Sequence, residues 1–154
     1  MDIYAILKKL EINYDKINHQ PVFTIEEAKF IKDKIPGVGV KNLFLKDKQN
    51  NFYLVLLKED EKLDFKEIAT KLNVSNLKFA QEKELQEILN ISRGSVTPLS
   101  IINDKNNKVL LIISKKLINQ KILVHPNINT STINIEYLDL IKFITFYNHN
   151  YILY

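Results

Sequence analysis

The chain of 154 residues contains no cysteine. This absence excludes disulfide bridges, thiolate metal ligands and a cysteine nucleophile together. Glycine and proline are scarce, with three and four residues respectively, so each of them marks a place where the backbone turns. An apolar run of membrane-spanning length is also missing, and the opening Met1-Asp2-Ile3-Tyr4 lacks the basic segment that begins a secretory signal peptide. We therefore expect a protein of the cytoplasm.

The remaining composition is that of an ordinary globular protein, with 45% hydrophobic and 26% charged residues. The length suits one domain over residues 1–154. The 22 basic and 18 acidic residues leave a net charge of +4. This mild excess is compatible with docking on nucleic acid but does not require it, because a composition biased toward lysine and asparagine accounts for it equally well.

Hydrophobic periodicity and turn residues predict alternating helices and strands. Helices are expected at 3–10, 25–32, 64–72 and 81–89 and near the C-terminus, with Leu138, Ile141 and Ile144 on the core face of the last one. Capping boxes are expected at Thr24 with Glu27 and at Asp64 with Glu67. Strands are expected at 17–20, 42–46, 52–57, 77–80, 99–103, 109–114, 122–124 and 133–135. Hairpin turns between several strands indicate a mixed sheet, so the predicted fold class is α/β or α+β in one domain.

The segment Gly94-Ser95-Val96-Thr97-Pro98 stands out from its surroundings. Its backbone amides are suited to hold an oxygen-rich group, although a plain connection between a helix and a strand is the simpler interpretation. Arg93, the only arginine, directly precedes it. The guanidinium of Arg93 is suited to grip a phosphate, or else is simply solvated.

Few other side chains are suited to chemistry. Lys41, with Asn42 beside it, follows a glycine-containing turn, yet one lysine among so many would by itself be taken as a surface residue. His125 precedes a proline, a position that is more often structural, and His19 and His149 are weaker candidates, the latter in a polar tail. No pair of histidines has metal-ligand spacing, and Ser95 and Thr97 have no evident base. We expect neither a metal nor a cofactor.

Three blocks in the same order resemble the YbaK/ProX superfamily of aminoacyl-tRNA deacylases. They are Pro36–Leu45, which reads PGVGVKNLFL, Gly94–Leu99, and Val124-His125-Pro126-Asn127. The resemblance runs from His19-Gln20-Pro21 to the last helix and is greatest to the alanyl-tRNA(Pro) editing proteins called ProXp-ala or PrdX. It implies a curved mixed sheet flanked by helices.

The resemblance also implies roles for the residues of these blocks. Lys41 would be the main functional side chain, supported by Asn42, and the amides of residues 94–97 would stabilise the oxyanion. His125 would position the aminoacyl group. Asn127 and Pro98 of these blocks are further expected substrate contacts. Arg93, on the strength of its guanidinium, is expected to contact the tRNA rather than the amino acid. The expected partners are the acceptor end of tRNA(Pro) and a prolyl-tRNA synthetase.

Two alternatives stay open. One is a cysteinyl-tRNA(Pro) deacylase of the YbaK type, and the other is a non-catalytic tRNA-binding or regulatory module. The intact Lys41-Asn42 pair, Gly94–Pro98 loop and His125 disfavour the second alternative. Ser92-Arg93 departs from the relatives, which often place proline before the glycine, and this departure bears on the acyl preference.

Overall fold

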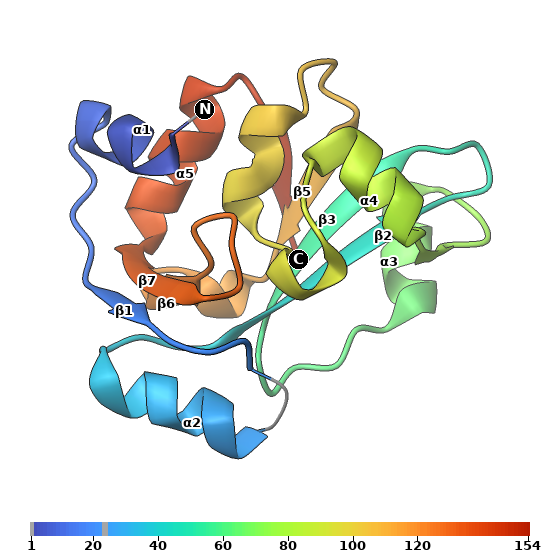
Figure 1. Cartoon of the computed structure of the whole chain (residues 1–154). Coiled ribbons are helices and arrows are strands. Elements are labelled where there is room, and N and C mark those ends of the chain that lie inside the picture. Colours follow the sequence, from blue (N-terminus) through green and yellow to red (C-terminus); the bar gives the residue numbers. More distant parts are fainter. Residues whose placement is uncertain (1, 23–24) are drawn as a thin grey trace.

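A computed structural model of the chain describes residues 2–22 and 25–154. Helices and strands alternate along it (Figure 1). The α-helices are α1 (Ile3–Lys9), α2 (Ile25–Lys34), α3 (Phe65–Leu72), α4 (Glu82–Leu89) and α5 (Tyr137–Phe146). Three short 3₁₀ helices are η1 (Arg93–Ser95), η2 (Pro98–Asn103) and η3 (Lys115–Leu117). The strands are β1 (Lys16–Asn18), β2 (Val40–Lys46), β3 (Phe52–Lys58), β4 (Lys78–Phe79), β5 (Val109–Ile113), β6 (Lys121–Val124), β7 (Ser131–Glu136) and β8 (Tyr151–Leu153).

The strands form two sheets. Five strands lie in the order β4-β2-β3-β5-β8, with β2 antiparallel to β3 and β4, and β5 parallel to β3 and β8. Three antiparallel strands lie in the order β1-β7-β6. A parallel bridge between Val38 and Ile122 joins the two sheets. The predicted fold class, a mixed α/β structure with a mixed sheet, is confirmed.

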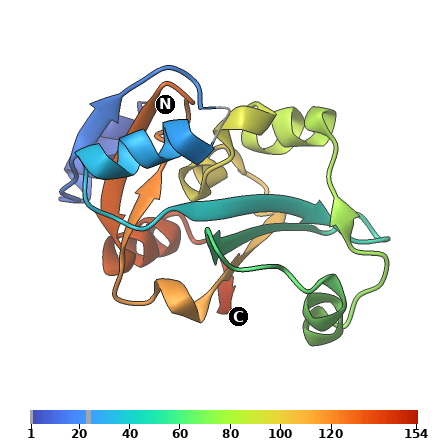
Figure 2. The same cartoon turned by 90° about the horizontal axis from the view of Figure 1, so that it is seen from below.

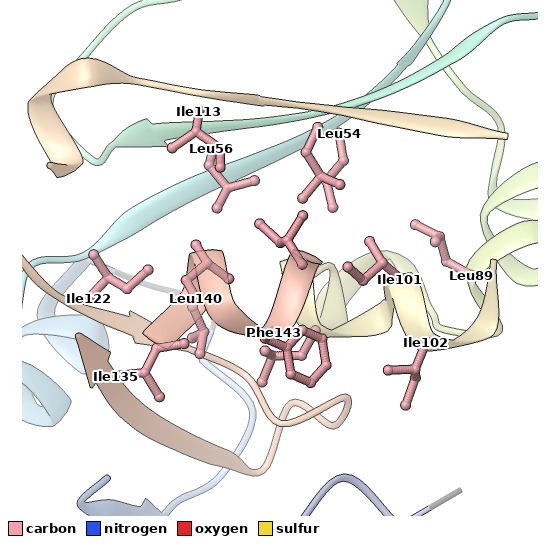
Figure 3. Close-up of a cluster of buried hydrophobic side chains, with 14 of the residues drawn as sticks. Leu54, Leu56, Leu89, Ile101, Ile102, Ile113, Ile122, Ile135, Leu140 and Phe143 are labelled. Atoms are coloured by element: carbon pink, nitrogen blue, oxygen red, sulfur yellow. The ribbon is translucent and has the colours of Figure 1, made fainter. Parts of the chain in front are cut away.

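The five-stranded sheet is apolar on both faces, because both faces are covered. On one face Leu54, Leu56 and Ile113 meet residues of the smaller sheet and of α5, including Ile135 and Phe143 (Figure 3). On the other face a second set of buried residues lies between the sheet and α3. Helix α3 lies below the sheet in Figure 2. That set consists of Leu45, Tyr53, Val55, Leu57, Ile68 and Ile112. Alternation along β2 and β3 therefore decides which side chains can reach a given face.

Local signals set most helix starts. The Asp64 carboxylate accepts a hydrogen bond from the Glu67 N–H at 3.1 Å, which confirms Asp64 as the N-cap of α3. The reciprocal bond of the predicted capping box is not formed, and the Glu67 carboxylate accepts from the Tyr154 hydroxyl instead. Gln81 and Glu84 form a capping box that begins α4. The cap expected at Thr24 lies outside the described residues. No helix in the described ranges is long and apolar enough to cross a bilayer.

The strand predicted at 99–103 is wrong, because these residues form the 3₁₀ helix η2. Pro98 has no N–H to donate to a sheet and occupies the first turn of η2. Ser100 donates both its N–H and its hydroxyl to Thr97 O, at 3.2 and 2.6 Å. Leu99 and Ile101 are fully buried all the same, so an apolar run without strict alternation did not distinguish a strand from a buried helix.

The last third of the chain brings two further corrections. Leu138 is 69% exposed, so the core face of α5 is made by Tyr137, Leu140, Phe143 and Ile144. His149, expected in a polar tail, is itself buried between the exposed Asn148 and Asn150, and the chain continues into β8, which pairs with β5. His149 Nε2 lies 3.1 Å from Asp104 Oδ2. Burial raises the pKa of Asp104, but hydrogen bonds from His149 and two backbone N–H groups outweigh it and hold that pKa below its ordinary value.

Candidate functional site

A close backbone approach brings the start of β2 beside β6. Gly37 has a φ of +151°, and a Cβ there would lie 2.8 Å from Leu123 Cδ2, so no other residue fits without strain. Val38 then donates to Lys121 O at 2.8 Å and accepts from Leu123 N at 3.0 Å. The first residues of β2 therefore lie beside the end of β6, where His125 follows.

The ring of His125 is oriented by the backbone. Its Nδ1 lies 2.9 Å from the carbonyl oxygen of Ser131. Because that oxygen can only accept, Nδ1 carries the hydrogen and Nε2 of the neutral ring keeps its lone pair. Burial lowers the pKa of His125 and the nearby His19 lowers it further, against the opposing influence of the Ser131 hydrogen bond. The neutral ring therefore persists at pH values where an exposed histidine is already charged.

His19 lies opposite His125, with the ring centroids 6.3 Å apart. Its Nδ1 lies 2.7 Å from the carbonyl oxygen of Gln20, and its Nε2 lies 2.8 Å from Thr132 Oγ1. In the neutral ring Nδ1 carries the hydrogen, so Nε2 accepts the hydroxyl hydrogen of Thr132. Thr132 Oγ1 is then left with lone pairs alone. Among the described residues, no group of three His, Asp or Glu side chains is arranged to hold a metal ion.

His125 and Thr132 line a cavity of about 160 Å³ between α2, the start of β2, the end of β6 and the start of β7. Most of its wall is apolar. The apolar lining residues are Val22, Ala28, Ile31, Val40, Leu123 and Val124, and the others are Lys32, Gly39, Asn42, Glu59, His125 and Thr132. Lys32 and Glu59 form an ion pair and are both partly exposed. The cavity suits a small group that is apolar on one side and polar on the other.

Asn42 also lines a second cavity, of about 390 Å³, together with Arg93 and Val96. Asn42 therefore stands between the two cavities. Its Oδ1 is buried and has no hydrogen-bond partner among the described residues, and the same is true of Asn127 Oδ1. Because an unpaired buried acceptor is costly, each such atom calls for an explanation, and a ligand donor is one.

The Gly94–Pro98 loop lies against the turn between β6 and β7 (Figure 1), where Thr97 donates to His125 O. The φ of Gly94 is not positive, and a Cβ there would make an ordinary contact, 3.4 Å from Asn129 Nδ2. The N–H of Ser95 donates to Ser92 O at 3.0 Å, so it is not free to bind a substrate oxygen. Ser95, Thr97 and Pro98 are buried, and the loop reaches the second cavity through Arg93 and Val96.

Lys41 leaves the opposite face of β2 from Asn42, because neighbouring side chains alternate along a strand. Its ammonium donates to the carbonyl oxygen of Glu61 at 2.5 Å. Lys41 is not among the described residues that line either cavity. The structure thus brings together Asn42, His125 and the β6–β7 turn, and it holds Lys41 beside the segment that follows β3. The functional role expected for Lys41 stays a prediction.

Sequence reasoning missed several lining residues of the first cavity. Ile31 belongs to a helix that the sequence predicts from a capping box, with no sign of a binding role, and Thr132 lies in a polar stretch without a motif. The VGV tripeptide 38–40 could have indicated this wall of the cavity. A Cβ at Gly39 would overlap the Glu59 carboxylate, which lines the same cavity. A conspicuous glycine beside a strand start often marks such a close approach.

The model of the aminoacyl-tRNA editing domain matches residues 19–143. A prolyl-tRNA editing protein ProX from Acetoanaerobium sticklandii is 39% identical over 144 residues, which are 92% of this chain and 88% of the relative. A prolyl-tRNA synthetase associated domain-containing protein 1 from Danio rerio is 35% identical over 146 residues, 93% of this chain and 79% of the relative.

Solved structures repeat the fold. A crystal structure described as a candidate trans-editing enzyme for prolyl tRNA synthetase superposes with a TM-score of 0.73 at 15% identity. The match covers 98% of this chain and 92% of that one. At this level of identity the likeness concerns the arrangement of the elements, which is the same in both proteins.

Proposed function

The chain belongs to the aminoacyl-tRNA editing domain family and is an aminoacyl-tRNA deacylase, and we propose that it removes alanine from mischarged alanyl-tRNA(Pro). The tRNA assignment is supported by the ProX relative, whose name specifies prolyl-tRNA editing. The Danio rerio relative is named for association with prolyl-tRNA synthetase, which makes that synthetase a candidate partner. We place this activity in the cytoplasm, where the substrate is formed.

The observation that carries the choice of alanine is the cavity of about 160 Å³ beneath α2. Ile31 and Leu123 give it an apolar wall, suited to a methyl side chain, and Asn42 and His125 supply polar atoms on the other side. The prolyl ring is bulkier and rigid, so we expect it to fit against this wall less well than a methyl side chain does. Such a pocket discriminates less against serine, which only adds a hydroxyl.

The reaction breaks the ester bond between the acyl carbon and a ribose oxygen. The oxygen of a water molecule adds to the acyl carbon, and the released ribose oxygen takes up a proton. The protein supplies position for that water and donors for the developing oxyanion. We assign the donor role to the amides of Gly94, Val96 and Thr97, since the Ser95 amide already donates to Ser92 O. The Lys41 ammonium joins them only when it leaves Glu61 O, its partner in this structure, and turns toward the substrate. The vicinal ribose hydroxyl of the substrate assists.

The second cavity lies on the other side of Asn42 and is where we place the terminal nucleotide of the tRNA. Arg93 lines it and is 82% exposed, with Nε 3.6 Å from Glu82 Oε2. This carboxylate holds the guanidinium at the mouth of the cavity, where it can meet a phosphate. The tRNA acceptor end would thus lie over η1 with its aminoacyl group turned past Asn42.

The test is a set of initial deacylation rates for alanyl-, seryl-, cysteinyl- and prolyl-tRNA(Pro) at equal concentration. We expect alanine to be released fastest, serine more slowly and proline hardly at all. Cysteine released fastest would instead make the protein a cysteinyl-tRNA(Pro) deacylase. Binding of tRNA without cleavage of any of the four would contradict the proposal and favour a binding module.

A further inference from the structure

We infer that Glu82, the first residue of α4, is a positioning residue that fixes the entry of the Gly94–Pro98 loop through the backbone N–H of Arg93. The inference rests on the proposed function, in which amides of this loop stabilise the oxyanion, and it assigns the orientation of the loop to a side chain outside it. It also separates two roles of Arg93, because the backbone of this residue serves the loop whereas its side chain serves tRNA binding.

The segment that follows α4 returns to the beginning of that helix. The helix ends at Leu89, and Asn90 then takes left-handed backbone angles, with a φ of 53°, which turn the chain. Ile91, the next residue, is buried. Glu82 and Arg93 therefore come into contact although they are 11 residues apart in sequence, and their contact closes the connection between α4 and η1.

Both oxygens of the Glu82 carboxylate take part in this contact. Oε1 accepts the backbone N–H of Arg93 at 3.1 Å and the side-chain amide of Gln86, one helical turn later, at 3.4 Å. Oε2 lies 3.6 Å from Nε of Arg93, an exposed ion pair that contributes little by itself. The bond to the backbone N–H does not depend on the guanidinium. It is therefore kept when a tRNA phosphate takes the guanidinium, and the loop entry stays fixed as tRNA binds.

The N–H of Arg93 controls the loop because Arg93 is the first residue of η1. A helix leaves its first N–H groups without a partner in the helix itself, and Glu82 supplies an acceptor for one of them from outside. At the other end of the loop, Thr97 donates to the carbonyl oxygen of His125 at 2.7 Å. The amides of residues 94–97 are thus held between two fixed points, one on α4 and one on the turn between β6 and β7.

The backbone at this point permits a substitution that replaces the hydrogen bond by a covalent restraint. Ser92 has a φ of −88° and a ψ of 165°, the extended conformation that a residue before proline adopts. Proline is favoured at the first position of a helix, because its fixed φ suits a 3₁₀ helix and no partner in the helix is lost with its N–H. Arg93→Pro should therefore hold the loop entry without Glu82, whereas Arg93→Ala should not.

Amide hydrogen exchange of the free protein tests the inference without any substrate. We expect Glu82→Ala to raise the exchange rates of amides 93–97 roughly threefold to tenfold, the factor that one hydrogen bond contributes, while the amides of β3 keep their protection. Glu82→Gln retains an oxygen for the Arg93 N–H and should stay close to the natural chain. The matched control is Glu87→Ala, which removes an exposed acid of the same helix that pairs with Lys83. Unchanged loop exchange in Glu82→Ala would overturn the inference.

Kinetics with the aminoacyl-tRNA that the natural chain hydrolyses fastest test whether this support serves catalysis. Glu82→Ala should lower kcat by roughly the same factor, because the oxyanion donors lose their position. Adding Arg93→Pro should recover kcat but leave KM high, since the guanidinium is lost. Adding Arg93→Ala instead loses the same guanidinium and should recover nothing.

Equal recovery by the two second substitutions would show that Glu82 does not act through the Arg93 backbone. Failure of Arg93→Pro to recover kcat, in a protein whose β3 amides stay protected, would show the same. The exchange measurement needs no tRNA, and the acyl preference is decided by the deacylation panel. The inference and the proposed function can therefore fail separately.

Discussion

The hydroxyl of Thr97 donates a hydrogen bond to the backbone carbonyl oxygen of His125 across 2.7 Å. Thr97 is fully buried and His125 is partly exposed, and the bond fixes the backbone that carries the His125 imidazole. This contact joins two sequence blocks that lie 28 residues apart. The Gly94–Pro98 loop thus supports the site by positioning His125, in addition to any role of its amides.

Replacing Thr97 with valine should remove that support without changing the side-chain volume much. We expect the unfolding free energy to fall by about 1–2 kcal/mol, because the His125 carbonyl loses its buried partner. We also expect kcat/KM for alanyl-tRNA to fall about tenfold as the ring loses its position. Thr97→Ser keeps the hydroxyl and should retain most activity. Equal losses in both variants would show that the methyl group of Thr97 matters rather than the hydroxyl.

Lys41→Ala tests the residue that the family resemblance marks most strongly. If its ammonium stabilises the oxyanion, the deacylation rate should drop on the order of a hundredfold to a thousandfold. Stability should change by less than about 1 kcal/mol, because the contact with Glu61 O is near the surface. Rates should be measured beside urea denaturation curves. Near-normal turnover would show that Lys41 has only a structural role, the hydrogen bond between β2 and the segment after β3.

Deacylation should depend on pH through His125. Burial holds the pKa of His125 below the ordinary histidine value of 6.5, so the neutral ring is retained in the folded protein when the unfolded chain already binds a proton. The rate should therefore stay level from neutral pH to about 6.5 and fall only in more acidic solution. The unfolding free energy should fall over the same interval, because the unfolded chain binds more protons there. His125→Asn should flatten both profiles, and an unchanged profile would contradict this assignment.

Two of the three glycines in the sequence blocks, Gly37 and Gly94, should differ sharply on substitution. Gly37→Ala should destabilise the fold by about 1–3 kcal/mol, because its φ of +151° suits glycine and the new Cβ would meet Leu123 at 2.8 Å. Gly94→Ala should cost no more than about 0.5 kcal/mol, since the φ of Gly94 is not positive and space is available there. Thermal denaturation of both variants measures the two losses of stability. A larger loss at Gly94 would show that its backbone is constrained by something other than the fold.

Arg93→Ala should weaken tRNA binding without changing the acyl preference. Loss of one phosphate contact should raise KM and reduce the salt slope of binding by roughly one unit or less. Titrations at several salt concentrations with uncharged tRNA(Pro) provide the measurement. Lys83→Ala is a suitable control, because Lys83 is an exposed base on the neighbouring helix α4 that pairs with Glu87. An unaltered slope with a changed acyl preference would place Arg93 at the amino acid instead.

The sequence by itself determined the features that depend on local chemistry. Asp64 caps α3 because an acidic side chain there meets free N–H groups, whatever lies around it. The hairpin of β2 and β3 follows from two apolar runs flanking Asp47–Asn51, where the Asp47 carboxylate accepts from the N–H groups of Gln49 and Asn51 at 2.9 Å. The three family blocks were readable for a similar reason, since each is short and continuous.

Only the tertiary structure decided which of these residues act together. Asn42 and Lys41 are neighbours in sequence, yet strand alternation turns Asn42 toward the cavities and Lys41 toward Glu61. Thr132 carries no motif and enters the site because β7 lies beside β6 and next to His19. The residues of η2 are as apolar as a strand, and Pro98 with the Thr97 cap made them a 3₁₀ helix. Local pattern fixes what a segment can form, whereas burial and long-range hydrogen bonds determine what it faces.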